Sequence, residues 1–316
     1  MLRYTELDWE NSDYGVYGYV PSASKNLAAL IVFAVAWAAH AVLGVFYRQY
    51  WFGTAFFITA GLETGGYIAR YLSSQNVMEQ MNNFIVQIVL LTIGPAFFMA
   101  GIYFLLAEVI VIWGVQRSRL MPWTYSQIFI TMDVISLVLQ AVGGGMAAVA
   151  TEDGDDNTTG THIMVAGLAF QVAATTIFLL LCADYFIRTV NWYRRRNAAT
   201  SSTDRASISS SSSDDAPAQF AHIRDSRTTH LFLLAILFAV MLVYVRSIYR
   251  VAELSQGWSG YLMASEGYFL VLDTLMVAIA MTVSWLFYPA VVLGRVSISK
   301  NLNIEKEETA DDLEMA

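Results

Sequence analysis

Residues 231–250 read LFLLAILFAVMLVYVRSIYR, an apolar run that ends in two arginines. A helix needs about 20 apolar residues to cross a bilayer core of about 30 Å, and this run has that length. Arg246 and Arg250 stand four positions apart near its end, and Glu253 follows three positions later. Side chains at this spacing share one face of a helix. The stretch therefore predicts a membrane-spanning helix with charged groups on one face near one end.

The rest of the chain repeats this pattern. Of its 316 residues, 56% are hydrophobic and only 14% are charged, and the mean hydropathy is +0.49, which is typical of a membrane protein. The stretch at 127–150 contains VGGGMAA, which is poor in large apolar side chains, so six spans is the alternative count. We expect an all-α integral membrane protein with seven transmembrane helices, at approximately 26–47, 51–72, 84–112, 127–150, 163–189, 231–250 and 266–293.

The first 25 residues lack the basic start and apolar middle of a cleaved signal peptide. They hold four acidic residues and no continuous apolar run, so we expect the first span to direct insertion. Cys182 is the single cysteine, and it cannot form a disulfide within the chain.

The distribution of Lys and Arg predicts the orientation, because these residues concentrate in cytoplasmic loops. With the N-terminus outside and the C-terminus cytoplasmic, thirteen of the eighteen fall on the inner side: Arg48, Arg117, Arg119, Arg188, Arg194, Arg195, Arg196, Arg205, Arg224, Arg227, Arg295, Lys300 and Lys306. Asn157 in DDNTTG matches the acceptor pattern for N-glycosylation and would then face outward.

Three segments are expected to lie outside the helical domain at 26–294. Residues 1–25 form an extracellular tail and residues 295–316 an acidic cytoplasmic tail. The cytoplasmic loop at about 191–230 is rich in serine and is expected to be disordered. Its Ser211 and Ser212 each precede an acidic residue by three positions, so phosphorylation is conceivable, although a flexible linker is the simpler interpretation.

Charged residues inside membrane spans usually face a protein interior or a water-filled cavity, because a charge in the bilayer centre costs about 2.5–3.5 kcal/mol on insertion scales. Seven such residues fall in the outer half of the membrane or at its outer boundary, on the second, sixth and seventh spans. They are Glu63, Arg70, Arg246, Arg250, Glu253, Glu266 and Asp273. Three are positive and four are negative. We expect an ion-paired cluster that lines an outward-facing cavity, and the alternative is a structural network that orients these three helices.

A second polar set lies on the fourth and fifth spans. Gln140 and Gln171 are expected to form interhelical contacts rather than ligand contacts. Asp133 has no Lys or Arg in its own span to neutralise it, so it is a further candidate for function.

Several classes of membrane protein are excluded or disfavoured. A retinal protein needs a lysine in its last span, but Lys25, Lys300 and Lys306 are the only lysines and all lie outside the spans. The motifs Asp-Arg-Tyr and Asn-Pro-x-x-Tyr of common seven-helix receptors are missing, as is a nucleotide-binding GxxxxGK[ST]. The four histidines do not stand at metal-ligand spacing. No metal, cofactor or nucleic-acid partner is expected.

The charged motifs, read together, resemble the fungal lipid-translocating exporter family, also called RTA-like or aminocholesterol-resistance proteins. The resemblance covers residues 17–294 and rests on the order and spacing of the motifs. At 288–290 the chain reads YPA, where a His-Pro-Gly-like turn is expected. The motifs are E-x-x-G-Y-x-x-R at 63–70, GPAFFMAGIY at 94–103, D-x-x-S-x-x-x-Q-x-x-G-G-G at 133–145, G-L-x-x-Q at 167–171, R-x-x-Y-R-x-x-E at 246–253 and the pair Glu266 and Asp273.

The resemblance implies a seven-span protein of the plasma membrane, or of an endomembrane, that exports or flips amphiphilic lipids such as sphingoid long-chain bases. It also implies resistance to toxic amphiphiles. In this hypothesis a carboxylate among Glu63, Glu253, Glu266 and Asp273 pairs with the amine of the lipid. The main alternative is a lipid-responsive receptor or stress sensor that signals through the 191–230 loop and the tail. A membrane enzyme is disfavoured, because no nucleophile or metal set accompanies the acidic residues.

Overall fold

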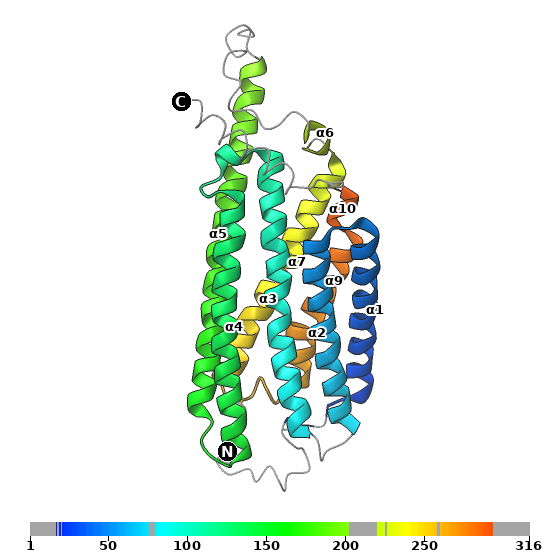
Figure 1. Cartoon of the computed structure of the whole chain (residues 1–316), viewed down its shortest axis with the longest axis vertical. Helices are drawn as coiled ribbons and strands as arrows, with labels where there is room; N and C mark the ends of the chain where they lie inside the picture. Colours follow the sequence, from blue (N-terminus) through cyan, green and yellow to red (C-terminus); the bar gives the residue numbers. More distant parts are fainter. Residues whose placement is uncertain are drawn as a thin grey trace, which may run out of the picture.

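The chain is a long helical bundle in the computed structural model, which describes residues 17, 19, 21–75, 80–201, 220–224, 226–257 and 260–292 (Figure 1). These residues contain helices and connecting turns, without a strand. The long helices are α1 (Ala23–Tyr47), α2 (Tyr50–Gln75), α3 (Gln80–Trp113), α4 (Pro122–Glu152), α5 (Thr158–Ser201) and α7 (Arg227–Ser255). A last long segment comprises α8 (Glu266–Tyr268), the π-helical turn η6 (Phe269–Leu275) and α9 (Met276–Leu286). The short elements are η2 (Val115–Arg117), α6 (Ala221–Arg224) and α10 (Pro289–Val292).

Among the described residues, six helical segments are long and apolar enough to cross a membrane, so the class of all-α membrane protein is confirmed. They are Ala23–Tyr47, Met81–Trp113, Pro122–Thr151, Thr158–Arg195, Arg227–Ser255 and Glu266–Val292. The stretch at 127–150, whose membrane span was in doubt, belongs to these six. The predicted span that does not is α2, a helix of 26 residues that is less apolar because it carries Glu63, Arg70 and several small or polar residues.

Long helices that follow one another in the chain run in opposite directions along the bundle (Figure 1). The start of α1, the turn between α4 and α5, and residues 260–265 lie at one end. The turn between α1 and α2, the loop that holds η2, and α10 lie at the other end. Helix α2 packs along both α1 and α3, while α4 packs along α5 and α7 packs against α9 and α5. The last long segment packs mainly against α7 and α1, and side chains of η6 also contact α2, which places α7 and η6 next to the site described below.

Small residues allow α4 and α5 to approach backbone to backbone. A Cβ atom added to Gly143 would lie 2.3 Å from the backbone nitrogen of Met164, and one added to Gly160 would lie 2.4 Å from that of Ala147. Such contacts are typical of membrane helices that pack through small residues. The glycine-rich run GGGMAA at 143–148 therefore supplies one side of this close contact.

The two prolines inside the predicted spans have different effects. Helix α3 continues through Pro95 as a single helix. The last segment, by contrast, ends its α-helical hydrogen bonding at Leu286 and resumes at Pro289 as α10. Proline has no N–H to donate, so it is readily accommodated as the first residue of a new helix.

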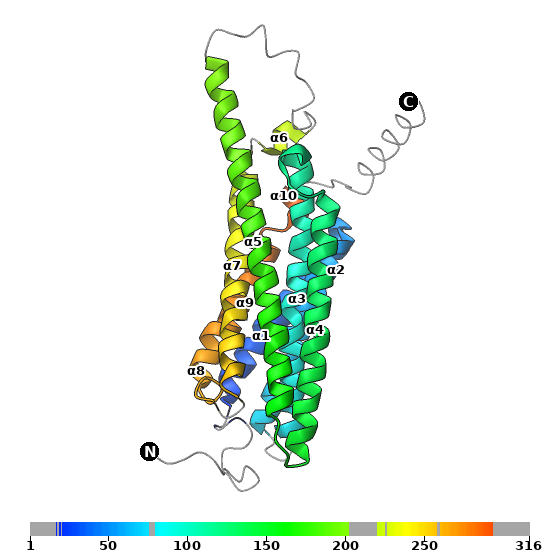
Figure 2. The same ribbon diagram turned by 90° about the vertical axis from the view of Figure 1, so that its left-hand side faces the viewer.

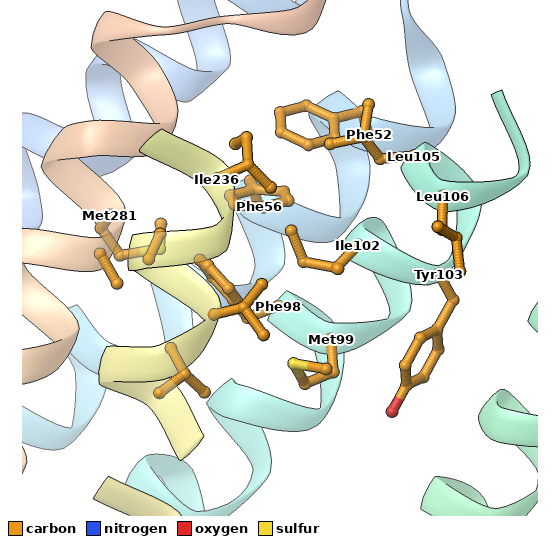
Figure 3. Close-up of a cluster of buried hydrophobic side chains, with 14 of the residues drawn as sticks. Phe52, Phe56, Phe98, Met99, Ile102, Tyr103, Leu105, Leu106, Ile236 and Met281 are labelled. Carbon is orange, nitrogen blue, oxygen red and sulfur yellow. The ribbon is translucent and has the colours of Figure 1, made fainter. Parts of the chain in front are cut away.

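Aromatic and aliphatic side chains fill the centre of the bundle (Figure 3). Phe56 from α2 packs between Phe52 and Phe98, with ring centroids 4.0 Å and 4.7 Å away. Ile236 of α7 and Met281 of α9 close the cluster from the other side (Figure 3). Large aliphatic side chains also cover the outside of the helices, such as Val42, Val138, Leu180 and Leu234, each more than half exposed. A surface of this kind suits contact with lipid tails.

The loop predicted at about 191–230 begins later than expected. Helix α5 continues to Ser201 and extends beyond the other helices, as Figure 2 shows. The sequence NWYRRRNAA contains no proline or glycine that would end the helix, and arginine and alanine favour it. At the other side of the loop, α6 and α7 are already helical. Ser211, Ser212, the N-terminal residues 1–16 and the tail at 293–316 lie outside the described residues.

Candidate functional site

Five of the seven predicted charged residues meet in the interior of the bundle, at the middle of α2. Each exposes at most 2% of its surface. They are Glu63 from α2, Arg246, Arg250 and Glu253 from α7, and Asp273 from η6. We call these five residues the central cluster. Its members come from three different helical segments, so they meet only when these helices pack against one another.

Arg246 is the hub of the central cluster. Its Nε atom lies 2.8 Å from Oδ1 of Asp273, and its Nη2 atom donates a hydrogen bond of 2.5 Å to the backbone carbonyl of Leu91. That carbonyl is the acceptor that residue 95 would use in an α-helix, but residue 95 is proline and has no N–H. Pro95 therefore frees the backbone oxygen that holds Arg246 in place.

Arg250 pairs with a carboxylate of its own helix. Its Nη1 atom donates to Oε2 of Glu253, and its Nε atom lies 4.0 Å from Asp273. The hydroxyl of Tyr249 donates to the second oxygen of Glu253 at 3.1 Å. Glu253 is thus bonded through both oxygens, so it is the best-satisfied carboxylate of the cluster.

Glu63 is the carboxylate with the least compensation. Its nearest cation is Arg246, whose Nη2 atom is 3.8 Å from Oε1, beyond hydrogen-bond distance. Neither carboxylate oxygen of Glu63 has a hydrogen-bond partner among the described residues. The same side chain lies against Gly94 of α3, where an added Cβ atom would be only 3.0 Å from Oε1. The glycine thus leaves room for a charged group at the centre of the bundle.

Asp273 reaches the cluster from a π-helical turn. Residues 269–275 form η6, between the α-helical turns of α8 and α9. Single π-helical turns are rare within helices and often occur at functional sites. Asp273 is fully buried and lies between the two arginines of α7. The neighbouring Thr274 accepts a hydrogen bond of 2.6 Å from the hydroxyl of Tyr67 on α2, which ties this turn to the helix that carries Glu63.

Arg70 does not join the central cluster. It lies two helical turns from Glu63 towards the end of the bundle where α1 begins. Its partners in the described part of the chain are the neutral side chains of Asn26 on α1, Gln87 on α3 and Tyr19. Its guanidinium also stacks over the ring of Phe269, 4.1 Å from the centroid. Arg70 therefore links α1, α2, α3 and η6 rather than forming a pair with a carboxylate.

Two tyrosines ahead of α1 complete the surroundings of Arg70. The hydroxyl of Tyr17 donates to Oε1 of Gln87 at 2.7 Å, and this oxygen also accepts from Arg70. Burial raises the pKa of Tyr17 to about 12 and also raises the pKa of Tyr19. Both phenols are therefore neutral at physiological pH.

Glu266 lies at the beginning of the last segment and is bound to the start of α1. Its Oε1 accepts from the backbone N–H of Ser22 at 2.8 Å, and its Oε2 lies 3.4 Å from Nζ of Lys25. Asn26 contacts Glu266 at 3.5 Å with its Nδ2 while its Oδ1 accepts from Arg70 at 2.8 Å. Asn26 therefore connects the two predicted residues that the central cluster does not include.

The second predicted polar set lies between α3, α4 and α5. Asp133 accepts a hydrogen bond of 3.0 Å from the hydroxyl of Tyr103. Gln140 donates to Ser136 at 2.5 Å and to Gln171 of α5 at 3.0 Å, which is the interhelical contact predicted from the sequence. These groups contact one another and not the five residues of the central cluster.

Asn157 lies in the short turn between α4 and α5, where its Nδ2 donates to Thr151 at 2.9 Å. The described residues contain no group of three or more His, Cys, Asp or Glu side chains arranged to hold a metal ion.

The packed rings of Phe52, Phe56 and Phe98 lie on the side of Glu63 towards the start of α2. Phe56 is two helical turns from Glu63 on the same face of α2. At the other end, Arg70 and its neutral partners fill the bundle. Since the five residues of the central cluster are almost fully buried, helices must move apart for a ligand to reach them.

Sequence reasoning missed several partners of these charges. Asn26, Tyr249 and the carbonyl of Leu91 bond to Arg70, Glu253 and Arg246 respectively, and Tyr67 bonds to Thr274 next to Asp273. One signal was present for Leu91, because a proline inside a span always leaves the carbonyl four residues earlier without its usual donor. Asn26 offers a weaker signal, as an amide at the first turn of an apolar helix.

Comparisons with known proteins agree with this architecture. The sequence model of the family "RTA1 like protein" matches residues 56–295, which includes all five residues of the central cluster. The sphingoid long-chain base transporter RSB1 of Saccharomyces cerevisiae strain S288c is 41% identical over 287 residues, which cover 88% of this chain and 74% of the yeast protein. The protoporphyrin uptake protein 1 of the same strain is 30% identical over 73% of this chain and 68% of its own length. Protein RTM1 of Saccharomyces cerevisiae is 29% identical over 69% of this chain and 61% of its own length. No solved structure matches this chain.

Proposed function

The chain belongs to the RTA1-like family, and from this premise we propose that it is a membrane transporter that exports or flips amphiphilic lipids with a cationic head, such as sphingoid long-chain bases. The resemblance seen in the sequence is thereby confirmed. RSB1 is named as a sphingoid long-chain base transporter, and it aligns with nearly the whole chain. Two of the three relatives described above are named for transport or uptake, which favours transport over the receptor and agrees with a non-enzymatic role.

One observation supports a cationic substrate above all others. Glu63 is a fully buried carboxylate without a hydrogen-bond partner among the described residues, in a cluster of three carboxylates and two guanidiniums. A lone buried carboxylate is costly unless a cation or a proton compensates it. The primary amine of a long-chain base is such a cation, and the apolar side chains around the cluster suit its hydrocarbon tail. Glu63 is therefore our first candidate for the residue that binds the amine.

The other predicted residues are assigned supporting roles. Arg246, Arg250, Glu253 and Asp273 position Glu63 and set the charge of the site. Arg70 and Glu266 hold the start of α1 against α2 and η6, through Asn26. Asp133, Gln140 and Gln171 join α4 to its neighbours.

We propose that α2 is the seventh membrane span. Its length of 26 residues is sufficient, and its two charged side chains are buried in the bundle instead of facing lipid. With seven spans, an outside N-terminus puts most Lys and Arg residues in the cytoplasm, in agreement with the positive-inside rule. The helical domain then covers 26–294, with an outer tail before it and an acidic cytoplasmic tail after it. Asn157 is then the candidate glycosylation site on the outer face, and Ser211 and Ser212 of the serine-rich loop are candidate phosphorylation sites.

The plasma membrane is the proposed location, because export of a toxic amphiphile there gives resistance to it. In that setting the amine enters from the cytoplasmic leaflet, pairs with Glu63 and leaves to the outer leaflet.

Transport can be tested directly with the purified full chain in liposomes. A fluorescent long-chain base is placed in one leaflet, and its appearance in the other leaflet is followed by extraction with albumin. We expect the wild-type protein to accelerate this movement by about tenfold or more over protein-free liposomes. Glu63→Gln should reduce the rate to the protein-free level.

A matched control uses the same substitution elsewhere. Glu108 lies on α3, 14 residues from Gly94 and about 20 Å along the helix, outside the central cluster. Glu108→Gln should keep the wild-type rate. Equal rates for wild-type protein and Glu63→Gln, at equal amounts of protein, would rule out the proposed role of Glu63. Equal rates with and without wild-type protein would rule out transport of this class of lipid.

A further inference from the structure

The five charges of the central cluster pair in a way that leaves one carboxylate over. Arg246 lies closest to Asp273, at 2.8 Å, and Arg250 is bonded to Glu253. Each guanidinium thus lies closer to another carboxylate than to Glu63. Glu63 is left at 3.8 Å from an Nη2 atom that already donates to Leu91. The cluster therefore has room for a single additional positive charge, and that charge belongs at Glu63.

The same excess of one carboxylate is found when the groups that face Glu63 are taken helix by helix. From α7 they are Arg246 and Arg250, and from η6 the carboxylate of Asp273. From α3 the approaching groups are the backbone at Leu91 and Gly94, which carry no charge. On α2 itself the nearest titratable side chain is Tyr67, whose hydroxyl donates to Thr274. Glu253 lies beyond Arg250, and Tyr249 donates to it.

The next positive charges are held elsewhere. Arg70 lies two turns away on α2, with Asn26, Gln87 and Tyr19 as its partners. Lys25 pairs with Glu266. Neither cation reaches Glu63, since each is fixed by its own contacts near the start of α1.

We infer that the carboxyl group of Glu63 exchanges one monovalent cation for another, binding a proton and the amine of the substrate in turn. The protein thereby couples the outward movement of one amine to the inward movement of one proton. This inference rests on the proposed function. In the closed bundle the carboxyl group of Glu63 carries a proton, because a bare carboxylate there would lack compensation. When the ammonium group of the substrate arrives, the O–H bond of Glu63 breaks and the proton goes to water. The carboxylate then pairs with the ammonium.

The protonated form and the amine-bound form of the central cluster carry the same net charge. One proton leaves for each ammonium that binds, so the cluster has the same net charge before and after the exchange. Release of the ammonium on the outer side leaves Glu63 bare until a proton from that side replaces it. The return of the protonated cluster to the cytoplasmic side completes the cycle. Since the two cations compete for one carboxylate, neither can be carried without displacing the other.

Proton release on binding tests this inference without any transport measurement. The purified full chain in a non-ionic detergent is titrated with a primary alkylamine at about pH 6, where the free amine is protonated, in two buffers of different ionisation enthalpy. The difference between the two heats gives the number of protons released. We expect about one proton per amine bound, and an affinity that falls by about tenfold for each unit of decreasing pH. Glu63→Gln serves as the blank, because it has no carboxyl proton to lose, and Glu108→Gln should behave as the wild type.

The outcomes separate the two proposals. Amine binding or transport by the wild type without proton release would overturn the exchange and leave the proposed function intact. Proton release that persists in Glu63→Gln would place the exchange on another residue and also overturn the inference. If the wild type neither binds the amine nor accelerates lipid movement in liposomes, the proposed function fails, and the exchange fails with it. The proton count on wild-type protein decides the inference even if Glu63→Gln does not fold.

Discussion

Arg246 of α7 donates a hydrogen bond to the one backbone carbonyl of α3 that Pro95 leaves without its usual helical donor. The bond from Nη2 to the oxygen of Leu91 is 2.5 Å long. The same nitrogen is the cationic atom of Arg246 that lies nearest to Glu63, 3.8 Å from its Oε1, and its hydrogen bond is already used by Leu91. A helix-breaking residue in one span thereby decides which carboxylate of another span remains uncompensated. The sequence motif GPAFFMAGIY thus has a physical link to the charges on α2 and α7.

Replacing Pro95 by alanine tests this link. Alanine restores an N–H that can bond to Leu91, so Arg246 loses its backbone acceptor and can turn towards Glu63. We expect transport to fall by about tenfold, while the melting temperature stays equal or rises, because proline costs about 3 kcal/mol inside a helix. Liposome transport and thermal unfolding of the same preparation measure the two effects.

The coupling can be checked in a double-mutant cycle. In an Arg246→Met background, Pro95→Ala should have no further effect on transport, since the side chain on which it acts is gone. Independent effects of the two substitutions would show that Pro95 acts by another route.

A second prediction concerns the stability of the central cluster. Arg246→Met removes the cation that lies 2.8 Å from Asp273, and loss of one partner from a buried pair costs about 3–5 kcal/mol. The double variant Arg246→Met with Asp273→Leu removes one charge of each sign. We expect it to unfold at a higher temperature than Arg246→Met alone, as measured by thermal unfolding in detergent. A double variant less stable than the single one would mean that the contact of Asp273 with Arg250, at 4.0 Å, stabilises the bundle by itself.

The sequence predicted the helices well, because long apolar runs between charged loops admit few other structures. Helix ends were less accurate, as with α5, where helix-favouring residues continue the helix past the membrane to Ser201. The seven charged residues were placed at similar depth from helical spacing alone. Spacing could not show that Arg70 and Glu266 bind Asn26 and stay apart from the other five, because partner choice depends on side-chain contacts between helices. Nor could it reveal the π-helical turn that carries Asp273.

A third prediction uses the close contact of α4 and α5. Gly143→Ala places a methyl group about 2.3 Å from the backbone of Met164, where no side chain can move aside. The helices must separate, and overpacking of this kind costs about 1–3 kcal/mol. Thermal unfolding should show a lower melting temperature than for wild type.

Gly145→Ala is the matched control, because an added Cβ atom there meets nothing within 4 Å. It should be neutral or slightly stabilising, since alanine favours the helix. Equal melting temperatures for the two variants would contradict the packing described.

The last prediction follows from the buried phenol of Tyr17, which bonds to Gln87 beside Arg70. Its pKa in the folded protein is about 12, above the value of about 10 in an unfolded chain. The folded state therefore keeps the phenolic proton over a range in which the unfolded state loses it. The contribution of Tyr17 to stability is complete below about pH 10 and is lost as the pH rises towards 12, by about 2–3 kcal/mol in all. Tyr17→Phe should reduce stability at neutral pH through the lost hydrogen bonds, and its melting temperature should fall less steeply than that of the wild type between about pH 10 and 12. Thermal unfolding of both proteins across this range measures the difference in slope, and parallel curves would show that Tyr17 titrates as an exposed phenol.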